Sequence, residues 1–282
     1  MNPTVHKMNP LAVAAVITGV LAVAGGVAAL VASWQPLPVI IAMVVGVAVI
    51  LIGAHVLGRG LPADAIADDS IHSSPVRLEG ALDPALSRGL WIVKWMLAIP
   101  HYLVLIPLFV AMLVVTMAAG FVILFTGRYP AALFRFSVGV FRWGWRVGFY
   151  GYSAAGTDRY PPFTLAPTDY PATLEIAYAE RLSNGLVLVK PWLLALPHLI
   201  ILAALTGEHW GWGDPGAGVS LLGILVLVAL VILLFTGVYR AGIFDLTLGV
   251  NRWSYRVMAY VVLMTDKYPP FRLDQGPTEP NN

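Results

Sequence analysis

The sequence predicts an all-α integral membrane protein with about six transmembrane helices, two interfacial amphipathic helices and tandem repeats. Three observations support this fold class: the composition, the length of the uncharged segments and a duplication of motifs. Of the 282 residues, 59% are hydrophobic and 11% are charged, whereas about a quarter of the residues of a soluble domain are charged. This composition excludes an ordinary soluble domain. It also excludes a disordered chain, because disorder requires low hydrophobicity.

Charge and cysteine content exclude further classes of protein. Seventeen Lys and Arg residues and fifteen Asp and Glu residues leave a net charge of +2, which gives no indication of a nucleic-acid partner. The chain contains no cysteine, so disulfides, thiolate metal sites and thiol catalysis are excluded. The sequence has neither a phosphate-binding loop motif nor a His-Glu-x-x-His zinc motif. We therefore expect no cofactor and no metal.

The first 60 residues are expected to form a transmembrane hairpin. Residues 11–33 and 37–58 carry no Lys, Arg, Asp or Glu, and each is long enough for one helix across the bilayer. The short connection at Trp34–Pro36 allows only an antiparallel arrangement, and its proline prevents the first helix from continuing. A polar cytoplasmic linker is expected at 61–74.

The rest of the chain consists of two copies of one unit, 75–163 and 171–271. A short linker, 164–170, joins the copies, and a tail at 272–282 is expected to be disordered. The matching motifs occur in the same order in both copies. They are Pro75–Glu79 with Pro171–Glu175, Leu86–Leu90 with Leu182–Leu186, Lys94 with Lys190, Pro100-His101 with Pro197-His198, Leu124–Gly127 with Leu234–Gly237, Arg142 with Arg252, Arg146 with Arg256, and Thr157–Phe163 with Thr265–Phe271.

The spacing of these motifs indicates an insertion in the second copy. The offset between matching residues is 96 at the two lysines and 110 at the two Leu-Phe-Thr-Gly motifs. We place the extra residues at 207–218, a Gly- and Trp-rich stretch that is typical of a loop. This loop divides an apolar stretch into two predicted spans, 186–206 and 219–236. The corresponding stretch of the first copy, 90–126, is either one overlong helix or a hairpin turning near Pro107.

The distribution of basic residues favours the hairpin. Lys and Arg concentrate on the cytoplasmic side of membrane proteins. A hairpin in each copy places every basic stretch inside and leaves the base-free loop outside, whereas a single span in the first copy exports one basic stretch. The sequence therefore predicts six spans in the cell membrane, with both termini cytoplasmic. The two copies become parallel repeats related by an axis along the membrane normal.

Each copy continues with an amphipathic segment: 131–152 and 241–263. At about 100° per residue, Arg142 and Arg146 share one stripe of the first segment. A helix with a basic stripe and an aromatic body suits the inner headgroup region. The alternative is a further span in each copy, which is costly with several arginines in the hydrocarbon. A small cytoplasmic β element is expected from matching strands of the two copies, with strand-like sequences at 163–165 and 173–178.

The motifs together resemble a known family. The residues that carry the resemblance are Lys94, Ala98–His101, Leu124–Pro130, Arg142-Trp143 and Thr157–Phe163. They are similar to the membrane family named domain of unknown function 4389, which is common in actinobacteria. The resemblance covers about residues 75–271, in two copies, and leaves the first hairpin outside. As the family name says, it implies no activity and no catalytic residues.

Four ionisable residues lie within the apolar segments: Lys94, His101, Lys190 and His198. An ionisable residue inside a span is a functional hypothesis by default, and histidine titrates near neutral pH. These residues could therefore line a polar path between the two copies. In the alternative interpretation, the lysines extend to the headgroups and the histidines bind backbone groups freed by the neighbouring prolines.

The charged residues outside the spans form two further groups. Asp158 and Asp266 occupy the duplicated Thr-Asp-x-Tyr-Pro-Pro-Phe motif, where a structural role in a turn or an arginine pair is favoured over a catalytic pair. The second group suits anionic lipid or a protein partner, because arginine binds phosphate in bidentate fashion and the inner leaflet is anionic. It consists of Arg142, Arg146, Arg252 and Arg256. The alternative for this group is an anchor without a specific ligand.

Three functions remain open on this basis. The first is a non-enzymatic scaffold or accessory subunit that binds membrane lipid or a protein partner at the inner face. The second is a small transporter or channel with a path between the repeats. The third is a membrane-embedded enzyme acting on lipid through Asp158 and Asp266. The first is favoured because the sequence shows no catalytic motif.

Overall fold

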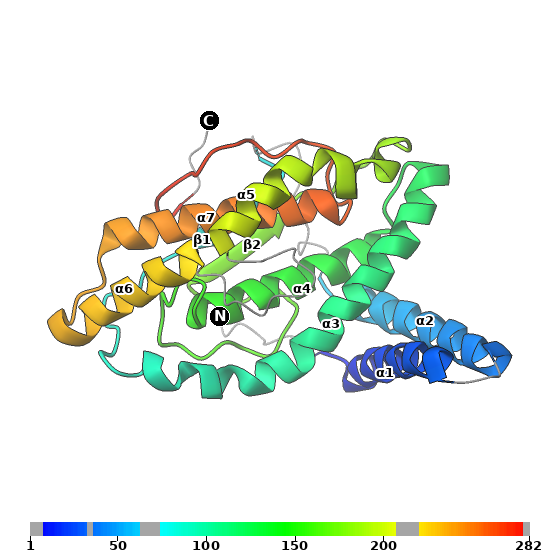
Figure 1. The fold of residues 1–282 in the computed structure, drawn as a ribbon, viewed down its shortest axis with the longest axis horizontal. Helices are drawn as coiled ribbons and strands as arrows, with labels where there is room; N and C mark the ends of the chain where they lie inside the picture. The colour runs from blue at the N-terminus through cyan, green and yellow to red at the C-terminus, as the bar shows by residue number, and fades with distance from the viewer. Residues whose placement is uncertain (1–7, 33–35, 63–73, 207–219, 279–282) are drawn as a thin grey trace.

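The computed structural model describes residues 8–32, 36–62, 74–206 and 220–278, and these are mostly helical (Figure 1). The elements in chain order are α1 (Pro10–Ala32), α2 (Pro36–Arg59), β1 (Val76–Gly80), α3 (Trp91–Thr126), α4 (Ala131–Tyr150), β2 (Ala172–Ile176), the 3₁₀ turn η2 (Leu186–Leu188), the π turn η3 (Lys190–Leu194), α5 (Leu196–Thr206), α6 (Leu221–Thr236) and α7 (Ala241–Val261). The loop predicted at 207–218, most of the linker 61–74 and the end of the tail lie outside the described residues.

The two predicted N-terminal helices are present as α1 and α2, which pack against each other (Figure 1). Glycines allow the close approach. A Cβ atom added at Gly19 would lie 2.7 Å from the carbonyl oxygen of Gly46, so the two backbones nearly touch. The end of α2 packs on α4 in the same way, because a Cβ atom at Gly58 would overlap the carbonyl oxygen of Ala132. Small residues are what close helix packing in membranes requires.

The first copy contains no hairpin at its apolar stretch. Helix α3 runs without a break for 36 residues, and Pro100 and Pro107 lie inside it. The prediction of a turn near Pro107 is therefore wrong. A turn there would have left backbone N–H and C=O groups unpaired among apolar side chains, whereas the continuous helix loses only the bonds that the two prolines cannot make. Figure 1 shows α3 as one long, curved helix.

The second copy has the same long helix, divided in two. Helices α5 and α6 follow each other along one line (Figure 1), and the Ser220 hydroxyl, at the start of α6, donates to the carbonyl of Leu205, at the end of α5, over 3.4 Å. The predicted spans 186–206 and 219–236 are therefore in line and not antiparallel. The sequence predicted six spans. Among the described residues, three helices are long and apolar enough to cross a membrane: α1, α2 and α3.

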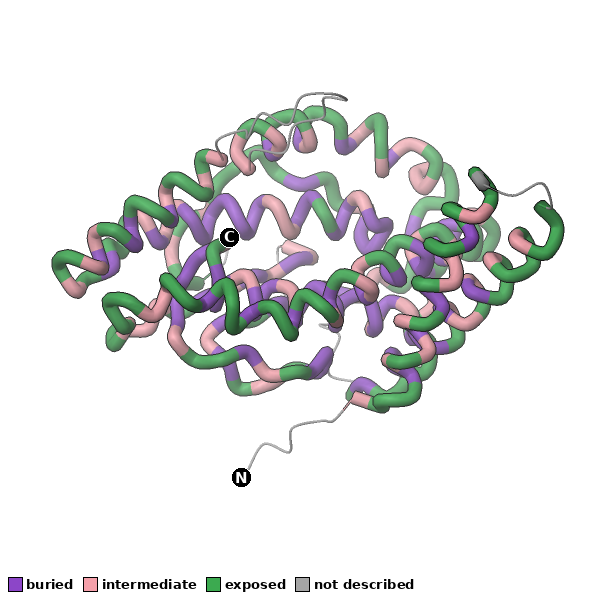
Figure 2. The backbone as a smooth tube through the Cα atoms, turned by 60° about the horizontal axis from the view of Figure 1, so that its bottom comes forward, coloured by how far each residue is buried: buried purple, intermediate pink, exposed green. Residues whose placement is uncertain are grey.

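The amphipathic segments form α4 and α7, which lie in the middle of the repeat region. Helix α4 contacts α3 on one side and β2 on another, and α7 contacts α5, α6 and β1. Figure 2 shows buried residues along these inner helices and exposed residues along the outer ones. The two helices are thus enclosed by protein, whereas the sequence predicted that they lie on the headgroups. The basic stripe faces inward because other parts of the chain supply its partners.

A two-stranded sheet completes the repeat region. Strands β1 and β2 pair antiparallel, with Leu78 opposite Leu174. They contain the matching motifs at the start of the two copies, so the expected β element is confirmed. The strand-like sequence at 163–165 forms no strand. The repeat region therefore has three layers: α3 with α5 and α6, then α4 with α7, then the sheet with the extended segments beside it.

We expect Gly58→Ala to destabilise the packing of α2 on α4. The added methyl group overlaps the Ala132 carbonyl, and overpacking of this kind costs about 1–3 kcal/mol. Thermal unfolding of the full chain in mild detergent measures the loss. Gly25→Ala in α1 is the control, because nothing lies within 4 Å of the added atom and alanine favours a helix. Equal midpoints for the two variants would contradict the close contact.

Candidate functional site

The predicted site residues form matching contacts in the two copies. In the first copy, the Lys94 ammonium lies 2.9 Å from the Asp158 carboxylate and donates to the carbonyl of Thr157 over 2.7 Å. The other carboxylate oxygen of Asp158 accepts the backbone N–H of Ser87 over 2.6 Å. The lysine side chain is only 2% exposed. This contact joins the start of α3 to the Thr-Asp-x-Tyr-Pro-Pro-Phe motif.

The second copy repeats this arrangement atom for atom. The Lys190 ammonium pairs with the Asp266 carboxylate and donates to the carbonyl of Thr265 over 2.8 Å. The backbone N–H of Ser183 donates to Asp266 over 2.6 Å. A buried ammonium needs a counter-charge and hydrogen bonds, and each copy supplies both from its own motif. The aspartates thus hold lysines, whereas the sequence favoured a turn or an arginine as their partner.

The environment of Asp158 lowers its pKa. Burial alone would raise the pKa of this carboxyl group, but the Ser87 N–H and the Lys94 ammonium favour the charged form and outweigh burial. The pKa of Asp158 therefore lies below its ordinary value. The carboxylate is ionised at neutral pH and serves as the permanent partner of the lysine.

Each histidine is enclosed by aromatic side chains of its own copy. The indole N–H of Trp143 donates to His101 Nδ1 over 3.1 Å, and the Phe163 ring stacks on the imidazole at 3.9 Å between centroids. Because Nδ1 accepts a hydrogen bond, the neutral imidazole carries its proton on Nε2. Tyr160 also contacts the ring. The histidine thereby attaches the Tyr-Pro-Pro-Phe motif to α3 and α4.

His198 has the same partners in the second copy. Trp253 donates its indole N–H to His198 Nδ1 over 3.2 Å, and the Phe271 ring stacks on the imidazole at 4.0 Å. These contacts of the lysines and histidines each stay within one copy. The sequence suggested that the four residues line a polar path between the copies, and the structure places them in separate clusters.

The four arginines of the basic stripes lie inside the protein. Their side chains donate to backbone carbonyls of extended segments, as Arg146 does to Thr164 over 2.7 Å and to Ala166 over 3.2 Å. Arg256 instead pairs with the Asp274 carboxylate at 2.7 Å. All four residues are at most 5% exposed: Arg142, Arg146, Arg252 and Arg256. The four arginines therefore contact the protein itself, and their surroundings add no support to the lipid or partner site expected from the sequence.

Two of these arginines connect the copies. Arg142 of the first copy donates to the carbonyl of Leu174 in β2 over 3.1 Å. Arg252 of the second copy donates to the carbonyl of Leu78 in β1 over 2.9 Å. These two leucines are also opposite each other in the sheet. Each copy therefore holds the strand of the other, and the exchange is symmetrical.

Several partners of these residues were not singled out in advance. They are Ser87 and Ser183 at the Asp carboxylates, Trp143 and Trp253 at the histidines, and Phe163 and Phe271 on the imidazole rings. All six belong to duplicated motifs, so the duplication itself was the signal that could have identified them. Within the described residues, no group of three or more His, Cys, Asp or Glu residues is placed to hold a metal ion.

These features define a mostly helical chain in which three described helices are long and apolar enough to cross a membrane. Two regions, 88–164 and 217–272, match the family described as "Domain of unknown function (DUF4389)". This match confirms the resemblance inferred from the motifs, and its two regions are consistent with two copies of the family's domain. No curated protein and no solved structure matches the chain.

We expect Asp158→Asn to destabilise the protein strongly. The change leaves the Lys94 ammonium buried without its counter-charge, and breaking a buried pair in this way costs about 3–5 kcal/mol. Urea or thermal unfolding in detergent measures the loss. Asp169→Asn is the control, because it breaks the exposed pair with Arg159, and exposed pairs contribute about 0–1 kcal/mol. Similar losses in both variants would show that the Lys94 pair is no stronger than a surface pair.

The lowered pKa of Asp158 also predicts a dependence of stability on acid. A carboxyl group whose pKa is lower in the folded state stabilises the fold above its unfolded pKa, near 4. This contribution disappears as the pH falls through the lower, folded pKa. We expect wild-type stability to fall more steeply below about pH 4 than that of Asp158→Asn. If the stabilities of wild type and Asp158→Asn changed in parallel from pH 7 to pH 2, this expectation would be contradicted.

Proposed function

We propose that the chain is a non-enzymatic membrane protein that binds membrane lipid through one face of its repeat region and acts there as a scaffold or accessory subunit. The observation that carries this proposal is the contrast between the outer layers. The layer of α3, α5 and α6 presents a broad apolar face, whereas the sheet layer presents polar side chains.

The apolar face consists of large side chains that point away from the protein. In α3, Leu103 is 69% exposed and Phe121 is 68% exposed, and in α6 Phe235 is 77% exposed. The outward positions of β2 are Thr173 and Glu175. A contiguous apolar face of this kind marks a membrane or protein contact, and the neighbouring α1 and α2 are apolar on all sides in the same way.

The length of α3 favours a helix that lies along the membrane. Its 36 residues measure about 54 Å at 1.5 Å per residue, whereas the hydrocarbon core is about 30 Å thick. Even a tilt of about 40° lengthens the path across the core only to about 39 Å. We therefore propose that α3 and the line of α5 and α6 lie within one leaflet, and that the α1–α2 hairpin crosses the bilayer.

This arrangement agrees with the distribution of charge. The basic stretches after α3 and after α6 then stay on one side of the membrane, as the positive-inside rule requires. The three layers of the repeat region stack along the membrane normal, so the copies become parallel repeats around that direction. The charge argument that favoured two hairpins is satisfied without them, and both termini lie on the cytoplasmic side.

The other two functions receive less support from the contacts. A transport path needs polar groups that follow one another along one route, but Lys94 and Lys190 are bound to aspartates of their own copies. His101 and His198 likewise lie in two separate clusters, each beside the tryptophan of its own copy. A catalytic pair needs its carboxylates at one site, but Asp158 and Asp266 each belong to the cluster of its own copy. For the same reason we assign lipid contact to the apolar face and not to the buried arginines.

The depth of α3 in the bilayer tests the proposal. We expect fluorescent labels at three single cysteines, Met96→Cys, Ile106→Cys and Phe125→Cys, to be quenched equally by a nitroxide-labelled phospholipid of a given depth. All three positions face outward and span most of the helix. A helix that crosses the membrane would instead place Ile106 deepest and the ends shallow, which would refute the one-leaflet arrangement.

A label at Thr173→Cys is the control for this measurement. Thr173 lies on the polar face of β2, so lipid nitroxides should leave it unquenched, whereas a water-soluble quencher should reach it. Because the chain contains no cysteine, each label occupies one position. Quenching of Thr173→Cys by lipid, or of all four labels by the soluble quencher alone, would overturn the assignment of the two faces.

A further inference from the structure

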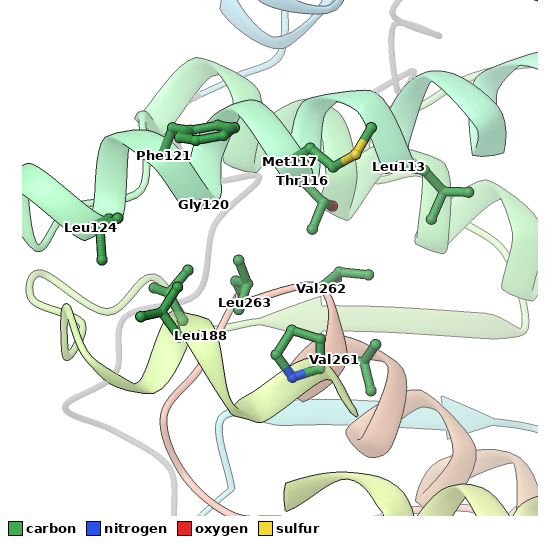
Figure 3. A pocket seen from close by; sticks show the side chains of 12 residues that line it. Leu113, Thr116, Met117, Gly120, Phe121, Leu124, Leu188, Val261, Val262 and Leu263 are labelled. Carbon is green, nitrogen blue, oxygen red and sulfur yellow. The ribbon is translucent and has the colours of Figure 1, made fainter. Parts of the chain in front are cut away.

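An apolar groove lies where the two copies meet. Its volume is about 710 Å³, within the range of about 300–1,000 Å³ typical of small-molecule sites. One wall is the α3 segment around Gly120, and the opposite wall is the part of the second copy around Leu188; Leu263, just after the end of α7, closes the groove (Figure 3). Val187 and Pro191 also line the second wall. Among the lining residues, Thr116 has the one polar side chain.

The sequence difference between the copies explains why space is left here. The alignment on the two lysines matches Val187 with Trp91 and Pro191 with Trp95. In the first copy, Trp91 is further covered by Tyr152, whose hydroxyl donates to the Trp91 carbonyl over 2.7 Å. The segment that contains Tyr152 is two residues shorter in the second copy. Smaller side chains and a shorter segment thus leave a groove in place of aromatic side chains.

We propose that this groove binds one acyl chain of a membrane phospholipid. Its walls carry no charge, so they cannot bind a headgroup or pair with the backbone of an extended peptide. The groove is continuous with the apolar face of α3, because Leu113, Met117 and Phe121 line it and are also more than half exposed. An acyl chain can therefore enter from the surrounding leaflet without leaving an apolar environment.

The end of the groove suits an anionic headgroup. Leu124 lines this end, close to the C-terminus of α3. There the backbone N–H of Leu182 donates to the carbonyl of Gly127 over 2.8 Å, so the backbones of the neighbouring residues Arg128 and Arg181 lie close to each other. Both arginines are exposed. Guanidinium groups bind phosphate well, and the phosphate of a lipid held by its chain would lie within the headgroup region beside them.

Native mass spectrometry of the full chain in mild detergent tests this inference. We expect about one phospholipid to be retained per wild-type chain, and Val187→Trp to lower the retained fraction at least fivefold because the indole fills the groove as Trp91 does in the first copy. Met117→Trp, at an exposed position of the opposite wall, should have the same effect. Leu227→Trp on the outward face of α6 is the matched control and should retain lipid.

The mass of the retained molecule identifies its source. A phospholipid supports the inference, whereas a free fatty acid or no bound lipid in the wild type overturns it. Equal retention by wild type, Val187→Trp and Met117→Trp also overturns it. Arg128→Gln combined with Arg181→Gln should reduce retention of phosphatidylglycerol relative to phosphatidylcholine at least threefold when both are supplied in mixed micelles. An unchanged ratio would refute the role of the two arginines.

The inference rests on the proposed position of the repeat region in the bilayer, and the two can fail separately. The Ile106→Cys label is read in the Val187→Trp background. If the label stays quenched by lipid nitroxides and wild-type chain holds no phospholipid, the groove assignment alone fails. If the label is not quenched by lipid nitroxides, the proposed function fails and takes the groove assignment with it.

Discussion

The structure of the repeat region depends on the requirement that every buried cation has a partner. Among the described residues, six cations are buried in α3, α4, η3 and α7, and each is held by carbonyls or carboxylates. Several of the carbonyls that the arginines bind belong to extended segments outside the sheet, 164–166 and 274–276. The arginines attach these irregular segments to α4 and α7, and the arginines would be too costly to bury without the carbonyls of the segments.

Much of the architecture could be predicted from the sequence, because it depends on local patterns. Length and lack of charge identified α1 and α2, and the basic stripes identified α4 and α7. The strand-like sequence at 173–178 identified β2, whereas β1 was recognised only as a duplicated motif and not as a strand. The hairpins predicted inside the two copies were wrong because the positive-inside rule specifies only the side of the membrane on which basic residues lie. A long helix that stays within one leaflet satisfies the rule as well as a hairpin does, and no local signal distinguishes the two.

The candidate site was harder to predict, for a physical reason. A stripe shows which residues share a face of a helix, but not what that face contacts. The partners of Arg142 and Arg252 are carbonyls at Leu174 and Leu78, and a backbone group has no sequence signature. The partners of His101 and His198 are side chains in duplicated motifs. A search for pairs of motifs that recur together would have found these.

The exchange of strands between the copies has a consequence for the origin of the fold. A chain with one copy would offer an unpaired strand and an arginine with no carbonyl to bind. Two such chains would satisfy each other through one two-fold axis, because Arg142 with Leu174 and Arg252 with Leu78 are the same contact made twice. That is the geometry of an isologous dimer. The tandem chain is thus arranged as a homodimer whose subunits became one polypeptide, and the groove marks where the subunits ceased to be identical.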